Sequence, residues 1–481
     1  MRFADPKTLK DTYDLVVVGT GFGSLFFVKK FLERRPRSKI LMLEWGKHHS
    51  HDWQVENQRN SDITDQNTLQ NQGDKPWLFT VCLGGGTNCW WGLSPRMLPD
   101  DFQVKTRFGH SVDWPISYDD LVPYYNEAER IIRVAGPDNL EAYYPKTPRY
   151  PMRPHNVSSV DRLLMAAMPD KHFAMPNGRL SAPLGSRGAC CASGSCNLCP
   201  VDAKMTALNT LDGVLQDPRV DLIVEAKVEW LDSQGGRITG AQFSHGGREY
   251  SAKGDLFILG ANAIYSPAIL MRSGIGGHGV GSYLCEKMFV GFEVLLDGLK
   301  HFDGGTDTTC FNLSFLDYEH RKAHGGAMVL IENRMRHGLR PEYGRWRETL
   351  PVGSYVEDEP LESNGITLDH MGNPIAKPFT RSAVAERAKT ALIDKLPDLL
   401  KALPIEKIRH RDTGTSAHIQ CNTRMGKTIE DSVVDSGLVH HTLRNLVIVG
   451  NSVFPTPGSG NPSLTTAALS LRAADRLARS A

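Results

Sequence analysis

The sequence lacks several features that would place it in a specialised class of protein. No apolar run reaches the roughly 18 residues that a membrane-spanning helix needs. The formal net charge is +1, so the composition gives no reason to expect nucleic acid or an anionic membrane surface as a partner. There is no internal repeat and no low-complexity tract. Hydrophobic residues at 40% and charged residues at 23% are the balance of an ordinary globular protein.

The N-terminus also lacks the pattern of a secretion signal. Residues 1–10 include basic side chains but no apolar segment and no cleavage site of small residues. The sequence therefore predicts a cytoplasmic protein, and a periplasmic location would require export together with a partner subunit that carries the signal. A chain of 481 residues is too long for one ordinary core, which predicts two domains.

Cysteine is unevenly distributed along the chain. Of the nine cysteines, four lie within ten residues, at Cys190, Cys191, Cys196 and Cys199. This bunching disfavours a dispersed disulfide framework and indicates a metal or redox site. Thiolates at this density suit iron–sulfur ligation. Zinc fits less well, because adjacent cysteines do not match the usual tetrahedral spacing, and a segment without any metal is the third interpretation.

Short apolar runs predict strands at the start, the middle and the end of the chain. The run 13–18 precedes a glycine turn, the pattern of 23–35 is helical, and 39–43 is a second buried strand. Further strands are expected at 222–229, 237–243, 255–259, 289–296, 326–332 and 446–450, and helices over 114–134, from 267, over 382–403 and over 462–479. A nucleotide-binding domain would then be assembled from distant segments, with a second domain inserted between them.

The glycine turn after the first strand has the order of a dinucleotide-binding motif. Gly19 permits the tight turn, and Gly21 lets the backbone approach a pyrophosphate at the N-terminus of the following helix. Glu44 lies 25 positions after Gly19, at the end of the second strand, where a carboxylate can accept ribose hydroxyl hydrogens. The expected cofactor contacts in this unit are Gly19, Gly21, Phe22, Gly23 and Glu44.

Two further segments favour FAD over NAD. The loop 83–92 is rich in glycine, small residues and tryptophan, and its backbone can press against a flat ring. Asn461 is a good N-cap and Pro462 a favoured first residue of the last helix, whose N-terminus can stabilise the negative charge of a reduced flavin. Additional FAD contacts are expected at Gly85, Gly86, Thr87, Asn88, Cys89, Trp90, Trp91 and Pro462.

These motifs resemble the glucose–methanol–choline (GMC) oxidoreductase family over almost the whole chain. The blocks that match are the first glycine turn, 84–87, 113–121, 260–267, 418–426 and 452–461. Within the family, the Cys190–Cys191 pair and residues 426–435 look most similar to the flavoprotein subunits of bacterial FAD-dependent glucose, sorbitol and fructose dehydrogenases. The C-terminal motifs are also similar to those of pyranose oxidase. The resemblance implies further FAD contacts at Val228, Ala261, Asn451 and Ser452.

The resemblance implies an α/β fold, with a Rossmann-like FAD-binding domain and an inserted α+β substrate domain on a mostly antiparallel sheet. The FAD-binding domain is expected to comprise 11–110 and 195–290, completed by 415–481 with the catalytic motif and the last helix. The substrate domain would comprise 111–194, which ends in the cysteine-rich segment, and 291–414.

The resemblance also places a catalytic base at His418 and its partner at Asn461. Oxidation of an alcohol by a flavin needs a base for the hydroxyl proton, and neutral histidine has a suitable pKa. His440 and His441 are the alternative bases. Cys89 stands where some relatives carry a histidine that binds flavin covalently, so it is either a small residue beside the ring or the site of a cysteinyl–flavin bond.

By the same resemblance, Cys190, Cys191 and Cys196 would hold a three-iron, four-sulfur cluster, with Cys199 left out as a ligand. The implied partners are a small-molecule sugar or alcohol, a small subunit and a cytochrome c acceptor. The function expected is FAD-dependent oxidation of a hydroxyl group on a sugar, glycoside or related alcohol. The alternatives are a cluster-free oxidase that uses oxygen and a flavin electron-transfer subunit without substrate chemistry.

Overall fold

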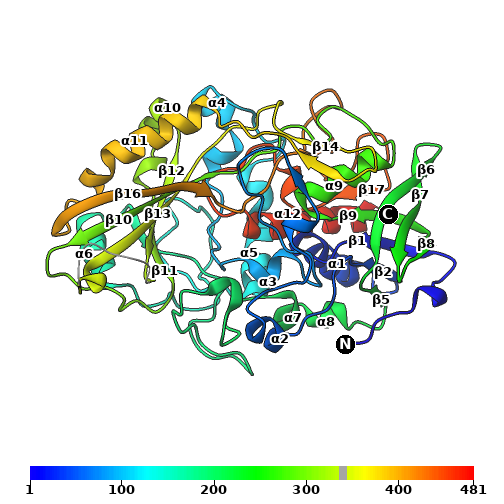
Figure 1. Cartoon of the computed structure of the whole chain (residues 1–481), viewed down its shortest axis with the longest axis horizontal. Helices are drawn as coiled ribbons and strands as arrows, with labels where there is room; N and C mark the ends of the chain where they lie inside the picture. Colours follow the sequence, from blue (N-terminus) through cyan, green and yellow to red (C-terminus); the bar gives the residue numbers. More distant parts are fainter. Residues whose placement is uncertain (335–343, 481) are drawn as a thin grey trace.

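A computed structural model describes residues 1–334 and 344–480 and places two large sheets at opposite ends of its long axis (Figure 1). One sheet is parallel and the other is antiparallel. The chain passes between them several times, so each sheet is built from segments that are far apart in the sequence.

The parallel sheet has five strands in the order β17, β9, β1, β2, β5. Their bounds are Leu446–Ile448, Gly254–Leu259, Tyr13–Val18, Ile40–Leu43 and Val220–Ile223. The residues of β1 and β2 are almost all apolar and buried, as is typical of strands inside a parallel sheet. Beside this sheet, α1 (Phe22–Arg34) packs against α12 (Ser463–Ser480), and α12 packs in turn against α5 (Tyr118–Ile132).

The register brings the strand ends of the parallel sheet to one edge. Val18 of β1 lies opposite Leu43 of β2 and Leu259 of β9, and Leu259 lies opposite Ile448 of β17. These four residues are the last of their strands. Because ligands bind outside the carboxyl ends of the strands in open α/β sheets, this edge is the expected position of a cofactor.

The antiparallel sheet has six strands in the order β16, β10, β13, β12, β11, β4. Their bounds are Ile405–Thr415, Met288–Leu296, Thr349–Val356, Ala327–Glu332, Thr308–Asn312 and His172–Ala174. Every neighbouring pair is antiparallel. The helix α11 (Ala383–Leu399) lies along this sheet (Figure 1) and buries Ala385, Ala388, Leu392 and Leu396 in its core.

Smaller elements complete the described part of the chain. Two three-stranded sheets combine β6 (Lys227–Gln234), β7 (Arg237–His245) and β8 (Arg248–Ala252), and β14 (Ile366–Leu368), β15 (Pro374–Ala376) and β3 (Gln70–Asn71). The remaining α-helices are α2 (His51–Glu56), α3 (Gly86–Cys89), α4 (Val104–Phe108), α6 (Ser159–Ala167), α7 (Ala207–Thr210), α8 (Asp212–Leu215), α9 (Asn262–Arg272) and α10 (Tyr318–His324). Among the described residues, no helix combines the length and the apolar composition that a membrane crossing requires.

The predicted fold class is confirmed, while several element bounds are wrong. The single strand expected at 222–229 is two strands in different sheets, because the backbone turns at Glu225, whose φ is +56°. The helix expected from Pro267 begins at Asn262 and contains that proline. The strand β16 was missed, since it is a charged edge strand that, within the described part of the chain, pairs only with β10 and has half-buried or exposed side chains over 405–411. The detailed domain bounds stay a prediction.

A buried ion cluster joins the two halves of the molecule. Arg321 of α10 donates to both carboxylate oxygens of Glu357, at 2.9 and 2.7 Å, and to Asp101 at 2.6 Å. Asp101 belongs to the short helical turn Pro99–Phe102 and also accepts from the Ser459 hydroxyl at 2.9 Å. The side chains of Arg321 and Asp101 are completely buried. The cluster therefore ties α10, the end of β13, and the loop before α12 together.

Replacing Arg321 by methionine tests this connection. Arg321→Met leaves two buried carboxylates without their cation, so we expect the free energy of unfolding to fall by about 3–5 kcal/mol. The matched control is Lys146→Met, which breaks a pair with Asp119 whose side chains are both 63% exposed and should cost less than about 1 kcal/mol. Urea unfolding followed by fluorescence would measure both variants, and equal midpoints would contradict the assigned role of Arg321.

Candidate active site

A cavity of about 670 Å³ lies where the edge of the parallel sheet faces the antiparallel sheet. This volume is in the range of roughly 300–1,000 Å³ that small-molecule and cofactor sites occupy. Its lining includes Val18, Leu43 and Val449 at or just after the ends of parallel strands, and Phe289, Leu330 and Tyr355 from β10, β12 and β13. A ligand in it would therefore touch both sheets.

Backbone contacts around the first glycine turn are too close for side chains. Gly19 has a φ of +87°, and a Cβ atom there would lie 2.6 Å from the Gly260 carbonyl oxygen. A Cβ on Gly23 would lie 2.8 Å from the backbone nitrogen of Gly450. At Gly21, which lines the cavity, an added Cβ meets nothing within 4 Å. The turn is packed on its protein side and open on its cavity side, as the approach of a pyrophosphate requires.

Glu44 lines the cavity directly after β2 and is only 5% exposed. One carboxylate oxygen accepts from the backbone nitrogen and the hydroxyl of Thr20, at 3.0 and 2.6 Å, and the other accepts from Gly46 N at 2.8 Å. Burial raises the pKa of Glu44, and these hydrogen bonds act against that rise. The carboxylate is thus held in a fixed orientation beside the glycine turn, which fits the ribose contact expected from its spacing.

The second glycine loop packs against the first. Gly85 has a φ of +45°, and a Cβ there would lie 3.4 Å from the Cα of Gly21. The cavity is lined by Gly19, Gly21, Phe22, Gly23, Gly85, Gly86, Cys89, Trp90, Trp91, Val228, Ala261, Asn451 and Pro462, all of them expected cofactor contacts. Thr87, Asn88 and Ser452 are buried outside that lining. Their side chains bond to the Gly84 carbonyl, the Leu83 carbonyl and the Thr423 hydroxyl and so brace the loops, while their contact with a cofactor stays a prediction.

His418 and Asn461 come together in this cavity. Asn461 Nδ2 lies 3.2 Å from His418 Nε2, although the two residues are 43 positions apart. Among the described residues, the buried atoms His418 Nδ1 and Asn461 Oδ1 have no hydrogen-bond partner. Because an unpaired buried polar atom costs about 1–3 kcal/mol, the pair is arranged to receive a polar group of a ligand.

The surroundings keep His418 neutral. Burial, reinforced by the positive charge of Lys287, holds the pKa of His418 well below 6.5. The Lys287 ammonium donates to the Pro457 carbonyl at 2.7 Å, and burial lowers its own pKa to about 8. The Tyr355 ring packs against the imidazole with 5.0 Å between ring centres. At pH 7 the imidazole is therefore unprotonated and able to accept a proton.

The alternative bases lie elsewhere. His440 and His441 are absent from the lining of the cavity. His440 Nδ1 accepts from the backbone nitrogen of Leu443 at 3.2 Å, and His441 Nε2 lies 2.8 Å from the Ser432 hydroxyl. Both histidines stabilise the turns around β17, so the geometry favours His418.

The wall formed by the antiparallel sheet is polar and aromatic. Arg334 makes two hydrogen bonds to Glu332, at 2.8 and 2.7 Å, and its guanidinium lies 4.7 Å from the centre of the Trp91 ring. All three residues line the cavity. The sequence motifs did not identify Glu332, Arg334 or Tyr355 as site residues. Glu332 ends β12, Arg334 follows it two positions later and Tyr355 lies in β13, so the pairing of these strands brings them to the cavity, and no local motif marks them.

The cysteine-rich segment adjoins the second glycine loop. Lys204 is buried and donates to the carbonyls of Asn88, at 2.6 Å, and of Asn197, at 3.3 Å. Asn197 lies between Cys196 and Cys199 and lines the cavity. The Arg179 guanidinium, also buried, donates to Cys196 Sγ at 2.5 Å. The segment therefore lies against the cavity with two buried cations beside it.

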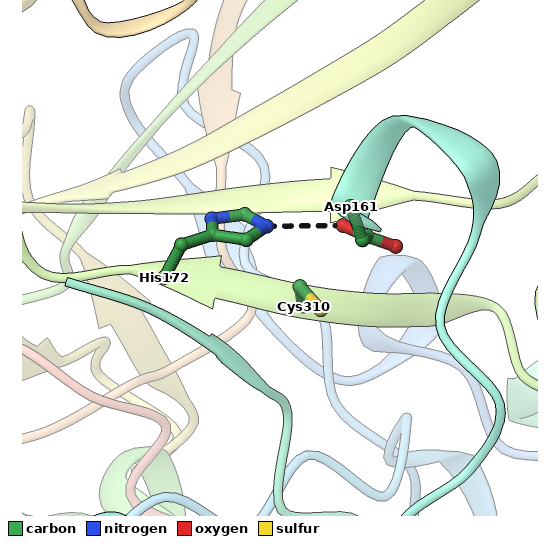
Figure 2. A group of neighbouring side chains, drawn as sticks. All are labelled: Asp161, His172 and Cys310. Atoms are coloured by element: carbon green, nitrogen blue, oxygen red, sulfur yellow. Dashed lines mark hydrogen bonds and ion pairs between the residues drawn. The ribbon is translucent and has the colours of Figure 1, made fainter. Parts of the chain in front are cut away.

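Three other side chains, none of which lines the cavity, form a compact buried group. Figure 2 shows His172 pointing at Asp161 with Cys310 below them, and this is the one His, Cys, Asp and Glu group in the described residues whose ligand atoms lie within 4.8 Å. Asp161 accepts from His172 Nε2 at 3.1 Å and from the backbone and hydroxyl of Ser158, which caps α6. His172 Nδ1 has no partner, whereas a metal-bound histidine normally donates its second N–H. Asp161 and His172 therefore belong to the hydrogen-bond network that caps α6.

A dinucleotide cradle that opens onto a neutral imidazole and an amide defines a flavin-dependent oxidoreductase acting on CH–OH groups. The chain belongs to the GMC oxidoreductase family: the family models for the N-terminal and C-terminal parts match residues 78–289 and 365–470. The recognition of the family from its motifs is thereby confirmed.

Characterised relatives include both dehydrogenases and oxidases. The fructose dehydrogenase large subunit of Gluconobacter japonicus is 28% identical over 82% of this chain and 80% of its own length. The 6'''-hydroxyparomomycin C oxidase of Streptomyces lividus is 28% identical over 98% of this chain and 93% of its own length. Among solved structures, pyridoxine 4-oxidase from Mesorbium loti matches with a TM-score of 0.71 at 17% identity, over 98% of this chain and 99% of that one, which supports the fold.

The cofactor cradle can be tested at Gly21. A leucine there would occupy the open space beside the first turn, so Gly21→Leu should yield folded protein with less than about a tenth of the FAD that the unchanged protein carries, because the pyrophosphate loses its place. The matched control is Gly213→Leu, which also adds a side chain at a site with nothing within 4 Å but lies outside the cavity. Flavin absorbance after acid precipitation measures the content, and equal content in both variants would refute the assignment of this turn.

Proposed function

We propose that this protein is an FAD-dependent dehydrogenase that oxidises a hydroxyl group of a sugar or glycoside and passes the electrons to an acceptor other than oxygen. The single observation that carries the proposal is the His418–Asn461 pair, 3.2 Å apart in a cavity that the two glycine loops also line. FAD fits this cavity, because the glycine turns pack closely against the protein on one side and leave open space on the side that faces the cavity.

A bound FAD would supply the acceptor for the two electrons and the hydrogen of the C–H bond. The chain supplies the acid–base chemistry. With its pKa held well below 6.5, His418 takes up the hydroxyl proton of the substrate as the C–H bond is broken. The Asn461 amide, whose Oδ1 has no protein partner, binds the same hydroxyl and fixes its direction. Tyr355 packs on the imidazole and limits its rotation.

A sugar is the substrate class that the opposite wall favours. Trp91 offers an apolar ring, while Glu332 and Arg334 offer hydrogen-bonding groups fixed by their mutual ion pair. A polyhydroxylated ring presents both apolar C–H faces and hydroxyl groups, so it can use all three side chains. A simple aliphatic alcohol has too few hydroxyl groups to use the hydrogen-bonding atoms of this pair as well as the catalytic residues. The fructose dehydrogenase relative agrees with this choice.

The cysteine-rich segment provides an exit for electrons in this proposal. A three-iron, four-sulfur cluster on Cys190, Cys191 and Cys196 would supply a one-electron carrier next to the second glycine loop. Arg179 and Lys204, both buried beside the segment, would balance the negative charge of such a group. Cys89, which lines the cavity, is proposed to be a small residue beside the ring. A small subunit and a cytochrome c complete the path outside the chain.

A cluster-free oxidase is the second candidate, favoured by the relative from Streptomyces lividus that is named an oxidase. The two functions differ in their acceptor. Turnover of D-glucose, D-fructose or D-sorbitol with a dye acceptor, and little hydrogen peroxide in air, would support the dehydrogenase. Stoichiometric peroxide without any added acceptor would support the oxidase instead.

Removing the base should abolish most turnover. We expect His418→Ala to lower kcat by about 10²–10⁴-fold, which is the usual contribution of a general base, while FAD content stays unchanged. The control is His441→Ala, a histidine outside the cavity, which should keep its kcat within about twofold of the unchanged enzyme, since surface changes away from such features have small effects. Steady-state kinetics with the sugars above measures both. Full activity of His418→Ala would instead indicate an electron-transfer subunit without substrate chemistry.

The cluster can be tested by its iron. Protein purified without oxygen should contain about three iron atoms per chain and show a broad visible absorbance beyond that of FAD. Cys196→Ser should lose the iron and keep its FAD, because a hydroxyl replaces a thiolate ligand. Cys199→Ser, the matched control three positions away, should keep both. Iron well below one atom per chain in fresh protein would rule the cluster out.

A further inference from the structure

Glu286 is a buried carboxylate that the proposed reaction does not use. It lies two positions before β10, and its side chain is fully enclosed. Just before it, Cys285 pairs with Gln420 through two backbone hydrogen bonds of 3.0 and 2.9 Å. This bridge brings Glu286 beside the residues that lead into His418. Enclosing an ionised carboxylate is costly unless its oxygens are paired, so its partners show what it does.

Most of the donors to Glu286 come from one turn, residues 415–418. Oε1 accepts from the backbone nitrogen of His418 at 2.8 Å, from the Thr415 hydroxyl at 2.7 Å and from the Ser416 hydroxyl at 3.3 Å. Oε2 accepts from the same Thr415 hydroxyl at 2.8 Å. A single carboxylate thus holds both ends of the turn that carries the proposed base.

This turn needs an external restraint. Ala417, between the restrained residues, has a φ of +58°, a left-handed conformation that costs an L-residue roughly 1–2 kcal/mol. Within the turn, the backbone nitrogen of Ala417 donates to the Thr415 hydroxyl at 3.2 Å. Without the carboxylate, the backbone at Ala417 would lower its free energy by leaving the left-handed conformation. The imidazole of His418 would move with it.

Lys75 supplies a positive charge beside Glu286. The two side chains form an ion pair in which Lys75 is 12% exposed. The ammonium lies 3.5 Å from the centre of the Trp77 ring and 5.4 Å from that of Phe379, so aromatic rings shield the pair from water. Hydrogen bonds to an ionised acceptor are shorter and stronger than neutral ones, which makes this pair a firm anchor for the turn.

Glu286 is unsuited to be a base itself. Thr415, Ser416, Ala417 and His418 line the cavity, but Glu286 does not. Its oxygens face the backbone and hydroxyl donors of the turn and the Lys75 ammonium. Glu286 can therefore affect the reaction only through the position of the turn 415–418.

We propose that Glu286, with Lys75 as its counter-ion, is a positioning residue that fixes the backbone of His418 so that the imidazole stays aligned with Asn461. The proposal rests on the role of His418 in the proposed function. A displacement of about 1 Å at a reacting group can lower the rate by 10²-fold, so loss of this restraint reduces the rate of the chemical step far more than substrate binding.

The test uses the FAD-loaded enzyme and the fastest sugar among D-glucose, D-fructose and D-sorbitol, with stopped-flow measurement of flavin reduction. Glu286→Gln should lower the limiting rate by about 10–100-fold and leave the apparent affinity within about threefold. Glu286→Asp should recover part of the loss. The matched control is Glu293→Gln in β10, a buried carboxylate paired with Arg411 at 2.7 Å, which should leave the rate near that of the unchanged enzyme.

A double-mutant cycle separates positioning from general damage. If Glu286 acts through His418, Glu286→Gln should add no further loss in a His418→Ala background. The same fold-loss in both backgrounds would overturn the proposal. If Glu286→Gln fails to fold, Thr415→Val removes the hydroxyl that binds both oxygens and should give the same pattern. Full activity of His418→Ala alone would defeat the proposed function, whereas a rate loss in His418→Ala without one in Glu286→Gln would defeat only this inference.

A second readout is independent of activity. The backbone N–H of His418 is bonded to the carboxylate, so its hydrogen exchange reports the restraint directly. In Glu286→Gln, exchange of peptides covering 415–420 should accelerate by about tenfold or more, because a hydrogen bond to a charged group is lost. Peptides covering β12 serve as the internal reference. Unchanged exchange at 415–420 would show that the carboxylate does not hold the turn.

Discussion

The close packing of backbone on backbone at the first glycine turn is the constraint on which the rest of the site depends. Gly19 contacts the Gly260 carbonyl, and Gly23 contacts the backbone of Gly450, at distances that leave no room for a Cβ atom. These contacts bring the ends of β1, β9 and β17 into one plane. Every other part of the cavity, including the second glycine loop and the N-terminus of α12, is positioned relative to that edge.

Buried positive charges around the cavity then determine which reactions the site can support. Lys287, Lys204 and Arg179 are all buried around the cavity, and burial lowers the pKa of both lysines to about 8. Lys287 helps to keep His418 unprotonated, while Arg179 and Lys204 lie beside sulfur atoms on the other side of the second loop. A fixed set of cations in a poorly hydrated place favours any negative charge that arises there. Such a field would stabilise both an electron-rich cofactor and thiolates.

The sequence predicts those parts of the site that are encoded locally. Gly19 and Gly21 lie in the turn between β1 and α1, and Glu44 directly follows β2. This order of elements predicts both the fold class and the position of the three residues at the cavity. Glu332, Arg334 and Glu286 were not predicted, because the pairing of distant strands brings them into place. β12 pairs with β13 beside the cavity, and β10 pairs with β16, which puts Glu286 next to residues 415–418. The polar edge strand β16 was missed for a related reason: its one neighbour, β10, provides most of its stabilisation.

The order of strands in the parallel sheet also has a consequence for biosynthesis. β1 leaves the ribosome long before its neighbour β9, which starts at Gly254, and longer still before β17, which begins at Leu446. The cradle cannot close until α12 has been synthesised, since Pro462 and Ser463 at the start of that helix form part of its wall. Until then apolar residues of this sheet stay exposed, and the complete cofactor site forms only after α12 has been made.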